Sequence, residues 1–136
     1  MWTWSYRVSA LIIDTSSWIA YLGDGQHAEV IEEALTEGRV YLPPVVAAEL
    51  TSGNLGKREM NELVFFLQDL ALCHTPLEHW LRVGNLRVKL RGMGETISTP
   101  DAHVAQCALD LGGELLSEDH VFERIAEPAS LRLAAR

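Results

Sequence analysis

The stretch LIIDTSSWIAYL, residues 11–22, joins an apolar run to an aspartate and then to three small hydroxylated residues. Residues 10–13 are apolar and partly β-branched, which predicts a short strand that is buried on both faces. Asp14 stands at the carboxyl end of that strand. Ligands of open parallel sheets bind in the crevice outside the carboxyl ends of the strands, so Asp14 is a candidate site residue.

The same residues also suit the start of a helix. Asp14, Thr15, Ser16 or Ser17 can each cap a helix that continues through Trp18, because their side-chain oxygens accept hydrogen bonds from free backbone amides. Ser17 has a second interpretation, in which its hydroxyl orients a carboxylate or the substrate. The sequence leaves open whether Asp14 caps this helix or belongs to a site.

Helices and strands alternate along the rest of the chain. Two start signals predict long helices: the capping box Thr75-Pro76-Leu77-Glu78, with a helix to residue 91, and Thr99-Pro100, with a helix over residues 101–111. Apolar spacing predicts further helices at residues 27–37, 45–50, 57–72 and 121–126. Strands are predicted at residues 40–42 and 114–117, with a candidate edge strand at 131–134. This order predicts a mainly parallel sheet in a three-layer α/β/α sandwich.

Length and composition indicate the class of protein. A chain of 136 residues, 48% hydrophobic and 22% charged, has room for one globular domain with a real core, so we expect a single domain over residues 1–136. Residues 1–9 are interpreted as an N-terminal extension. Its alternating Trp2, Trp4, Tyr6 and Val8 fit a strand or an interface segment, and an unstructured start fits equally well.

Charge and hydropathy limit the cellular location and the binding partners that the sequence predicts. No apolar run approaches the roughly 20 residues of a membrane-spanning helix, and the first residues lack the order of a secretory signal, so no membrane contact and a cytoplasmic location are expected. The formal net charge of −8 excludes a surface that is basic throughout. Any contact with nucleic acid must therefore be local.

Three further acids join Asp14 as candidates. Glu49 follows Val45 and Val46 at helical spacing, which places it on the apolar stripe of its helix, although an exposed glutamate is also compatible with so short a helix. Asp101 lies in the first turn of its predicted helix, where it either interacts with the helix dipole or points towards the sheet. Asp119 follows the strand at 114–117 and repeats the position of Asp14, or it merely starts a helix.

The four acids are stronger candidates for a site together than singly, because the predicted fold can bring them to one crevice. Two carboxylates about 5 Å apart repel each other by roughly 3 kcal/mol at an effective dielectric near 20. No lysine or arginine lies within three residues of Asp14, Glu49 or Asp101. Carboxylate oxygens favour Mg²⁺ or Mn²⁺, and such an ion suits phosphodiester hydrolysis because it activates water and neutralises charge on phosphate oxygens.

These motifs resemble those of PIN-domain ribonucleases, specifically the VapC-type toxins of toxin-antitoxin pairs. The resemblance extends from residue 10 to residue 127 and rests on LIIDTSSWIAYL with Asp14, LPPVVAAEL with Glu49, and TPDAHVAQCALDLGGELLSEDHVFERI with Asp101 and Asp119. It implies a divalent-metal site made by these four acids and endonucleolytic cleavage of RNA. It also implies a homodimer and inhibition by a cognate antitoxin.

One dense group of basic residues lies in the predicted helix that ends at residue 91: Arg82, Arg87, Lys89 and Arg91. On a helix they fall on two faces, which could flank a phosphate backbone, contact an acidic antitoxin segment, or simply be solvated.

The histidines and cysteines give weaker signals. His103 and His120 lie near two of the acids, but we find no second histidine or cysteine at ligand spacing around either, so a surface or supporting role is expected. Cys73 and Cys107 form no Cys-x-x-Cys pair and are interpreted as small buried thiols.

Two rival functions remain. A phosphotransfer or phosphatase domain also carries an aspartate at a strand end, but no second aspartate stands two residues after Asp14 and no lysine follows a later strand. A catalytically inactive PIN-like binding module would keep the fold and a protein partner, and the retention of all four acids argues against it.

Overall fold

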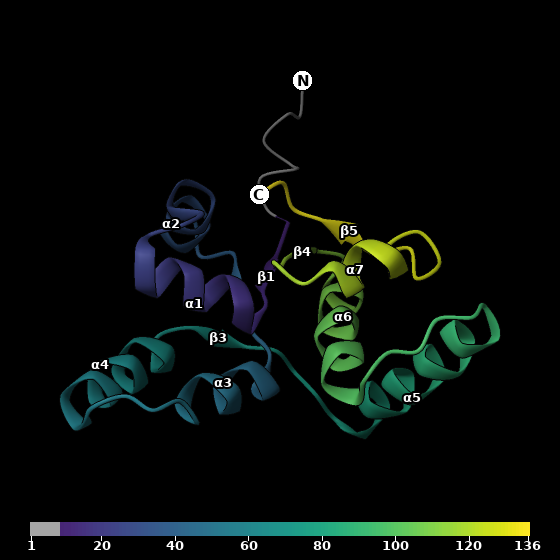
Figure 1. Ribbon diagram of the computed structural model, residues 1–136, viewed down its shortest axis with the longest axis horizontal. Helices are drawn as coiled ribbons and strands as arrows, with labels where there is room; N and C mark the ends of the chain where they lie inside the picture. The colour runs from purple at the N-terminus through teal and green to yellow at the C-terminus, as the bar shows by residue number, and fades with distance from the viewer. Residues whose placement is uncertain (1–8) are drawn as a thin grey trace.

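A five-stranded parallel sheet forms the centre of the computed structural model, which describes residues 9–136 (Figure 1). The spatial order of its strands is β3-β2-β1-β4-β5, and every neighbouring pair is parallel. The strands are β1 (Leu11–Ile13), β2 (Val40–Leu42), β3 (Ala71–Leu72), β4 (Glu114–Leu116) and β5 (Arg132–Leu133). The aromatic pattern of Trp2, Trp4, Tyr6 and Val8 lies outside the described residues.

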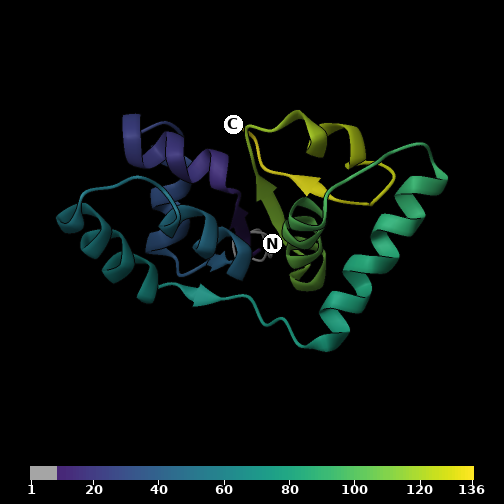
Figure 2. The same ribbon diagram turned by 60° about the horizontal axis from the view of Figure 1, so that its bottom comes forward.

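Seven helices in this part of the chain cover the sheet. They are α1 (Thr15–Asp24), α2 (Ala28–Thr36), α3 (Pro44–Thr51), α4 (Lys57–Gln68), α5 (Leu77–Gly92), α6 (Thr99–Leu111) and α7 (His120–Ile125). In Figures 1 and 2, α1 and α2 lie on one side of the central strands, while α6 lies on the other with α5 packed against it. The three-layer α/β/α sandwich with a parallel sheet is therefore confirmed.

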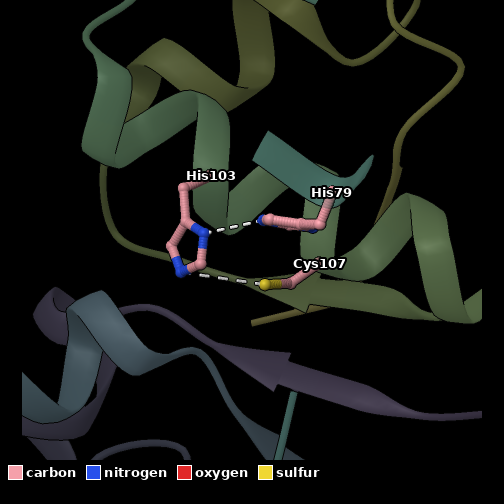
Figure 3. Close-up of side chains that lie close together, drawn as sticks. All are labelled: His79, His103 and Cys107. Carbon is pink, nitrogen blue, oxygen red and sulfur yellow. Dashed lines mark hydrogen bonds between the residues drawn. The ribbon is translucent and has the colours of Figure 1, made fainter. Parts of the chain in front are cut away.

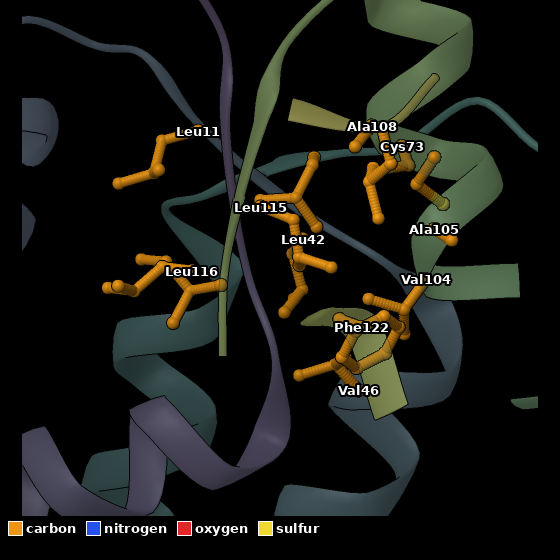
Figure 4. Packing of buried hydrophobic residues seen from close by; sticks show 14 of the residues in the cluster. Leu11, Leu42, Val46, Cys73, Val104, Ala105, Ala108, Leu115, Leu116 and Phe122 are labelled. Carbon is orange, nitrogen blue, oxygen red and sulfur yellow. The ribbon is translucent and has the colours of Figure 1, made fainter. Parts of the chain in front are cut away.

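The core explains why β1 stands at the centre of the sheet. All three residues of β1 are buried, as expected for a strand with neighbours on both edges and helices on both faces. Figure 4 shows Leu11 and Leu116 on one side of β1 and β4, with Leu115 and Leu42 on the other. Each large apolar side chain buried in this way contributes roughly 1.5–3 kcal/mol relative to exposure.

Small residues let the chain approach itself closely at one end of this core. A Cβ on Gly113 would lie 2.4 Å from the carbonyl oxygen of Ala10, so only glycine fits where β4 begins beside β1. The neighbouring Gly112 ends α6 in the left-handed conformation, with φ at 61°. The predicted stop of this helix at the glycine pair is confirmed.

Three local predictions are corrected. The helix predicted over residues 57–72 ends at Gln68, because Ala71–Leu72 instead pairs with β2 as the edge strand β3. Thr75 makes no capping bond, since α5 begins at Leu77 with Pro76 in the cap position. The helix predicted to start at Thr99-Pro100 is capped one residue earlier, by Ser98. The candidate edge strand at 131–134 is confirmed as β5.

No helix within residues 9–136 combines the length and the apolarity that crossing a lipid bilayer requires.

Candidate functional site

The sheet has a switch point between β1 and β4. After β1 the chain passes to β2 on one side, and it later returns to β4 on the other side. Such a switch opens a crevice at the carboxyl ends of the two strands, because their connections run away in opposite directions. Asp14 follows β1 and Ser117 follows β4, and the amide of Asp14 donates to the carbonyl of Leu116 at 2.9 Å. Both side chains therefore stand at the switch point.

The carboxylate of Asp14 accepts hydrogen bonds from serine hydroxyls and makes no capping bond to α1. Its residue is only 7% exposed, and its Oδ2 accepts a hydrogen bond from Ser117 Oγ at 3.0 Å and one from Ser16 Oγ at 3.4 Å. Asp14 occupies the cap position of α1, yet its side chain makes no capping bond. The capping alternative for Asp14 is therefore not what the structure shows.

Ser17 does not orient a carboxylate in this arrangement. It is buried in the first turn of α1, and its Oγ has no hydrogen-bond partner among residues 9–136. The hydroxyls that contact Asp14 belong to Ser16 and Ser117. Neither serine was predicted to have this role. Ser17 thus offers an unused polar atom one turn from the aspartate.

Glu49 lies on α3 and is exposed, so its predicted position on an inward-facing stripe is wrong. The side chain is nevertheless fixed, because Thr15 Oγ1 donates to Glu49 Oε1 at 2.6 Å. Thr15 directly follows Asp14. This bond therefore joins α3 to the start of α1 beside the crevice.

Asp101 lies in the first turn of α6 and is half-buried. Its backbone amide donates to Ser98 Oγ at 3.2 Å, which fixes the turn that carries the carboxylate. Ala105 and Ala108 on the same stripe of α6 are fully buried. The predicted orientation of Asp101 towards the core side of the helix agrees with this burial.

Asp119 is exposed and serves as a helix cap, the structural alternative that the sequence left open. Its Oδ1 accepts from the amide of Val121 at 3.0 Å at the start of α7. Its own amide donates to Ser117 Oγ at 3.0 Å. Ser117 thus links Asp119 with Asp14 across the ends of β4 and β1.

The four acids influence one another electrostatically. Burial raises the pKa of Asp14, and the charges of Asp101 and Glu49 raise it further. Burial likewise raises the pKa of Asp101, with additional repulsion from Asp119 and Glu49. Within residues 9–136 none of the four carboxylates forms a salt bridge. In the part of the chain that the structure describes, the four carboxylates therefore carry negative charge without an ion-pair partner.

This donor set fits a hard divalent cation. The available atoms are carboxylate and hydroxyl oxygens, which Mg²⁺ and Mn²⁺ prefer, and a cation would relieve the repulsion that raises the two pKa values. In the described part of the chain no three carboxylates bring oxygens within 4.8 Å of one another. Water molecules in the coordination shell are thus part of the fit, as is usual for Mg²⁺.

The basic residues of α5 divide into two pairs. Arg82 forms a two-pronged ion pair with Asp110, at 2.9 and 3.0 Å, and Arg87 Nε donates to the carbonyl of Ile97 at 2.9 Å. Lys89 and Arg91 are exposed, and among residues 9–136 neither has a side-chain hydrogen bond or an ion pair. The first pair supports the fold, while the second is available to a ligand.

An apolar groove of about 630 Å³ begins at Glu49 and runs between α1, α3 and α4. Its walls include large apolar side chains that are strongly exposed, among them Ile19 at 60%, Leu22 at 49% and Leu55 at 44%. Exposed apolar surface of this kind marks a site for a ligand or a protein partner. No local pattern in the sequence indicates this groove, because it forms from three separate helices.

A second polar cluster lies between α5 and α6 (Figure 3). His79, His103 and Cys107 are buried there, and their ligand atoms lie within 4.8 Å of one another. The expectation that His103 has no cysteine at ligand spacing is wrong, because Cys107 follows it by one helical turn. The spacing His103-x-x-x-Cys107 is the part of this cluster that the sequence could have indicated. The third residue, His79, lies on another helix and carries no such signal.

Comparison with known proteins gives one family and a set of similar folds. The family model described as the PIN domain matches residues 11–128. No curated protein matches the sequence.

The solved structures with similar folds include three VapBC complexes. DNA-bound VapBC from Salmonella typhimurium has a TM-score of 0.77 at 19% identity, over 93% of this chain and 97% of that one. VapBC2 from Rickettsia felis, bound to a promoter DNA fragment, has a TM-score of 0.74 at 18% identity, over 92% and 97%. VapBC-1 from nontypeable Haemophilus influenzae has a TM-score of 0.72 at 19% identity, over 92% and 96%. At these identities the likeness concerns the fold.

Proposed function

The chain belongs to the PIN-domain family, and on this premise we propose that it is a divalent-metal-dependent endoribonuclease and the toxin of a type II toxin-antitoxin pair. One observation supports the proposal: burial and the charges of neighbouring acids raise the pKa of Asp14, at the switch point of the sheet, and of Asp101. Within residues 9–136 no salt bridge offsets the charge of either carboxylate, or of Glu49 and Asp119. A bound divalent cation would offset this charge and activate water for phosphodiester hydrolysis.

The proposed ion is Mg²⁺ or Mn²⁺. When bound, it would supply an activated water and would neutralise charge that develops on the phosphate oxygens. Asp14, Asp101, Asp119 and Glu49 would hold it. Ser117 fixes the Asp14 carboxylate, and Thr15 fixes Glu49, so these two hydroxyls keep the acids in place before any ligand arrives.

RNA contact must be local on a chain with a net charge of −8. Of the basic residues singled out on α5, Lys89 and Arg91 are exposed and available for a phosphate backbone, whereas Arg82 and Arg87 have partners within the fold. We therefore assign Lys89 and Arg91 to RNA or antitoxin contact and give Arg82 and Arg87 a supporting position beside them.

The partner that we propose is a cognate antitoxin. Proteins of the same fold occur in VapBC complexes, and the groove that begins at Glu49 presents exposed apolar side chains close to the acids. An antitoxin segment in this groove would cover Glu49 and so block the site. We further propose that the toxin acts as a homodimer, as a single-domain chain and in the cytoplasm.

Digestion of defined RNAs by the full chain tests the proposal. We expect cleavage with Mg²⁺ or Mn²⁺, none after chelation, and a loss of at least about 100-fold in Asp14→Asn and Asp101→Asn, since each removes a charge that holds the ion. Asp24→Asn is the matched control, because Asp24 is an exposed acid at the far end of α1. Circular dichroism of all three variants checks that they fold.

Two outcomes would overturn the nuclease. The first is cleavage by both site variants at the rate of the unchanged protein. The second is an intact chain that binds its antitoxin but cuts no RNA with either ion, which would identify an inactive binding module. Growth arrest on expression, relieved by the product of a small neighbouring gene, distinguishes a toxin from a housekeeping nuclease.

A further inference from the structure

A buried nitrogen and sulfur cluster lies between α5 and α6, away from the four acids (Figure 3). His79 of α5 and His103 of α6 are each 0% exposed, and Cys107 of α6 is 1% exposed. Within residues 9–136 theirs is the one trio of histidine, cysteine or carboxylate ligand atoms within 4.8 Å of one another. The proposed nuclease site uses none of these three side chains.

The three side chains approach one another through both ring nitrogens of His103. His79 Nε2 lies 2.8 Å from His103 Nδ1, and His103 Nε2 lies 3.9 Å from Cys107 Sγ. Zinc binds nitrogen at about 2.0 Å and sulfur at about 2.3 Å, which puts tetrahedral ligands about 3.3–3.6 Å apart. An ion binds only one of the two His103 nitrogens, so shifts of about an ångström would bring one ligand atom of each side chain around it.

Asp110 gives the cluster the support that metal-binding histidines usually have. Its Oδ2 lies 2.7 Å from His79 Nδ1, so the Nδ1 hydrogen of His79 faces the carboxylate and Nε2 faces the cluster. Arg82 and Gln106 also donate to Asp110, which fixes the carboxylate. Burial alone would raise the pKa of Asp110, but the hydrogen bonds from Arg82, His79 and Gln106 outweigh it and lower the pKa to about 2.

We propose that His79, His103 and Cys107 form a structural zinc site that joins α5 to α6. Two imidazoles and a thiol are ligands for zinc and poor ligands for Mg²⁺, so this site and the acidic crevice select different ions. Zinc binding converts the Cys107 thiol to a thiolate and releases its proton to solvent. A hollow of about 230 Å³ lined by Cys107 and Asp110 gives the ion a route to the cluster.

The expected role is stabilising rather than catalytic. All three ligands are buried and come from two helices that pack together, so a bound ion acts as a cross-link that the unfolded chain cannot reproduce. Trp80 stacks on the His103 ring, with centroids 4.5 Å apart, and closes the cluster on one side. The proposal stands independently of the nuclease, because neither the acids nor RNA take part.

Cobalt titration of the reduced, metal-free full chain tests the site directly. We expect one equivalent of Co²⁺ to give a thiolate-to-cobalt charge-transfer band with the visible absorption of tetrahedral cobalt, and stoichiometric Zn²⁺ to bleach both. Zinc should also raise the unfolding temperature. Cys107→Ser should lose the charge-transfer band, and His103→Asn should bind cobalt at least about 10-fold more weakly.

Two variants serve as controls. Asp14→Asn should retain the cobalt band, which separates this site from the acidic crevice. Cys73→Ser should retain it as well, since Cys73 is the other buried thiol and does not belong to the trio. Absence of any charge-transfer band in the unchanged protein would overturn the proposal without recourse to a variant. A band that disappears with Cys73 and survives the loss of Cys107 would also overturn it.

Discussion

Ser117 donates a hydrogen bond to Asp14 across 3.0 Å, and this bond joins the ends of β4 and β1 although the residues are 103 positions apart in the chain. The same hydroxyl accepts from the amide of Asp119. One side chain therefore sets the relative position of two of the four acids. Its removal should affect the proposed metal site more than the fold.

Ser117→Ala should weaken Mg²⁺ dependence without unfolding the chain. Loss of a group that orients a metal ligand typically costs about 10- to 100-fold in metal affinity or activity, whereas one hydrogen bond contributes only about 1 kcal/mol to stability. Cleavage rate as a function of Mg²⁺ concentration measures the effect. Ser130→Ala, at an exposed serine, is the control. An unchanged Mg²⁺ requirement in Ser117→Ala would contradict the assigned role.

Asp14→Asn should stabilise the metal-free protein. Burial and neighbouring charges raise the pKa of Asp14, so protonation favours the fold and stability is lost as the pH rises through the folded pKa. Asparagine has no charge and can still accept from Ser117, so a gain on the order of 1 kcal/mol is expected near neutral pH.

Saturating Mg²⁺ should reverse this order. An ion at 100 times its dissociation constant stabilises the unchanged protein by about 2.7 kcal/mol, and Asp14→Asn should gain little. Urea unfolding with and without Mg²⁺ measures both parts, with Asp24→Asn as the control. If Asp14→Asn is the less stable protein without metal, the aspartate supports the fold and the proposed charge conflict is wrong.

Leu55→Glu should weaken antitoxin binding by at least about 10-fold, because it places a charge in the apolar groove that begins at Glu49. Leu111→Glu alters an apolar side chain of similar exposure, 41% against 44%, outside that groove. Calorimetric titration of each variant with the antitoxin compares the two. Equal binding by both variants would place the partner elsewhere.

The free energy of unfolding of the metal-free protein should decrease as the pH is lowered from about 6.5 to about 4. Burial and the adjacent His79 lower the pKa of His103 from 6.5 to about 4, so in this range the unfolded chain binds a proton that the folded chain rejects. This contribution is complete above pH 6.5. His103→Gln should flatten the slope of unfolding free energy against pH, whereas His120→Gln, at an exposed histidine, should not. Parallel slopes in all three proteins would contradict this assignment.

Local patterns sufficed for the elements that form the centre of the sheet. Residues 10–13 and 40–42 are short apolar runs with few alternatives, and the glycine pair after α6 defines a helix end by its backbone geometry. The strand β3 could not be predicted in this way, because Ala71–Leu72 is exposed and continues the helical pattern before it. Its pairing with β2 decides its conformation, and that pairing is not local.

The same difference between local patterns and non-local contacts applies to the candidate site residues. Asp14 and Asp119 follow strands, and that position alone made them candidates. Ser117 was not a candidate, because a serine after a strand carries no signal until the strand has a neighbour. The link between His79 and His103 depends on how α5 packs against α6, which no spacing within one helix reveals.

The central position of β1 has a consequence for synthesis. This strand emerges from the ribosome before every other described strand, yet its neighbours β2 and β4 follow it along the chain, and β4 comes only at residue 114. Asp14 and Ser117 can therefore meet only after β4 has been synthesised. A nascent or truncated chain that ends before β4 carries Asp14 without the strand that completes its surroundings, so the proposed metal site cannot form in it.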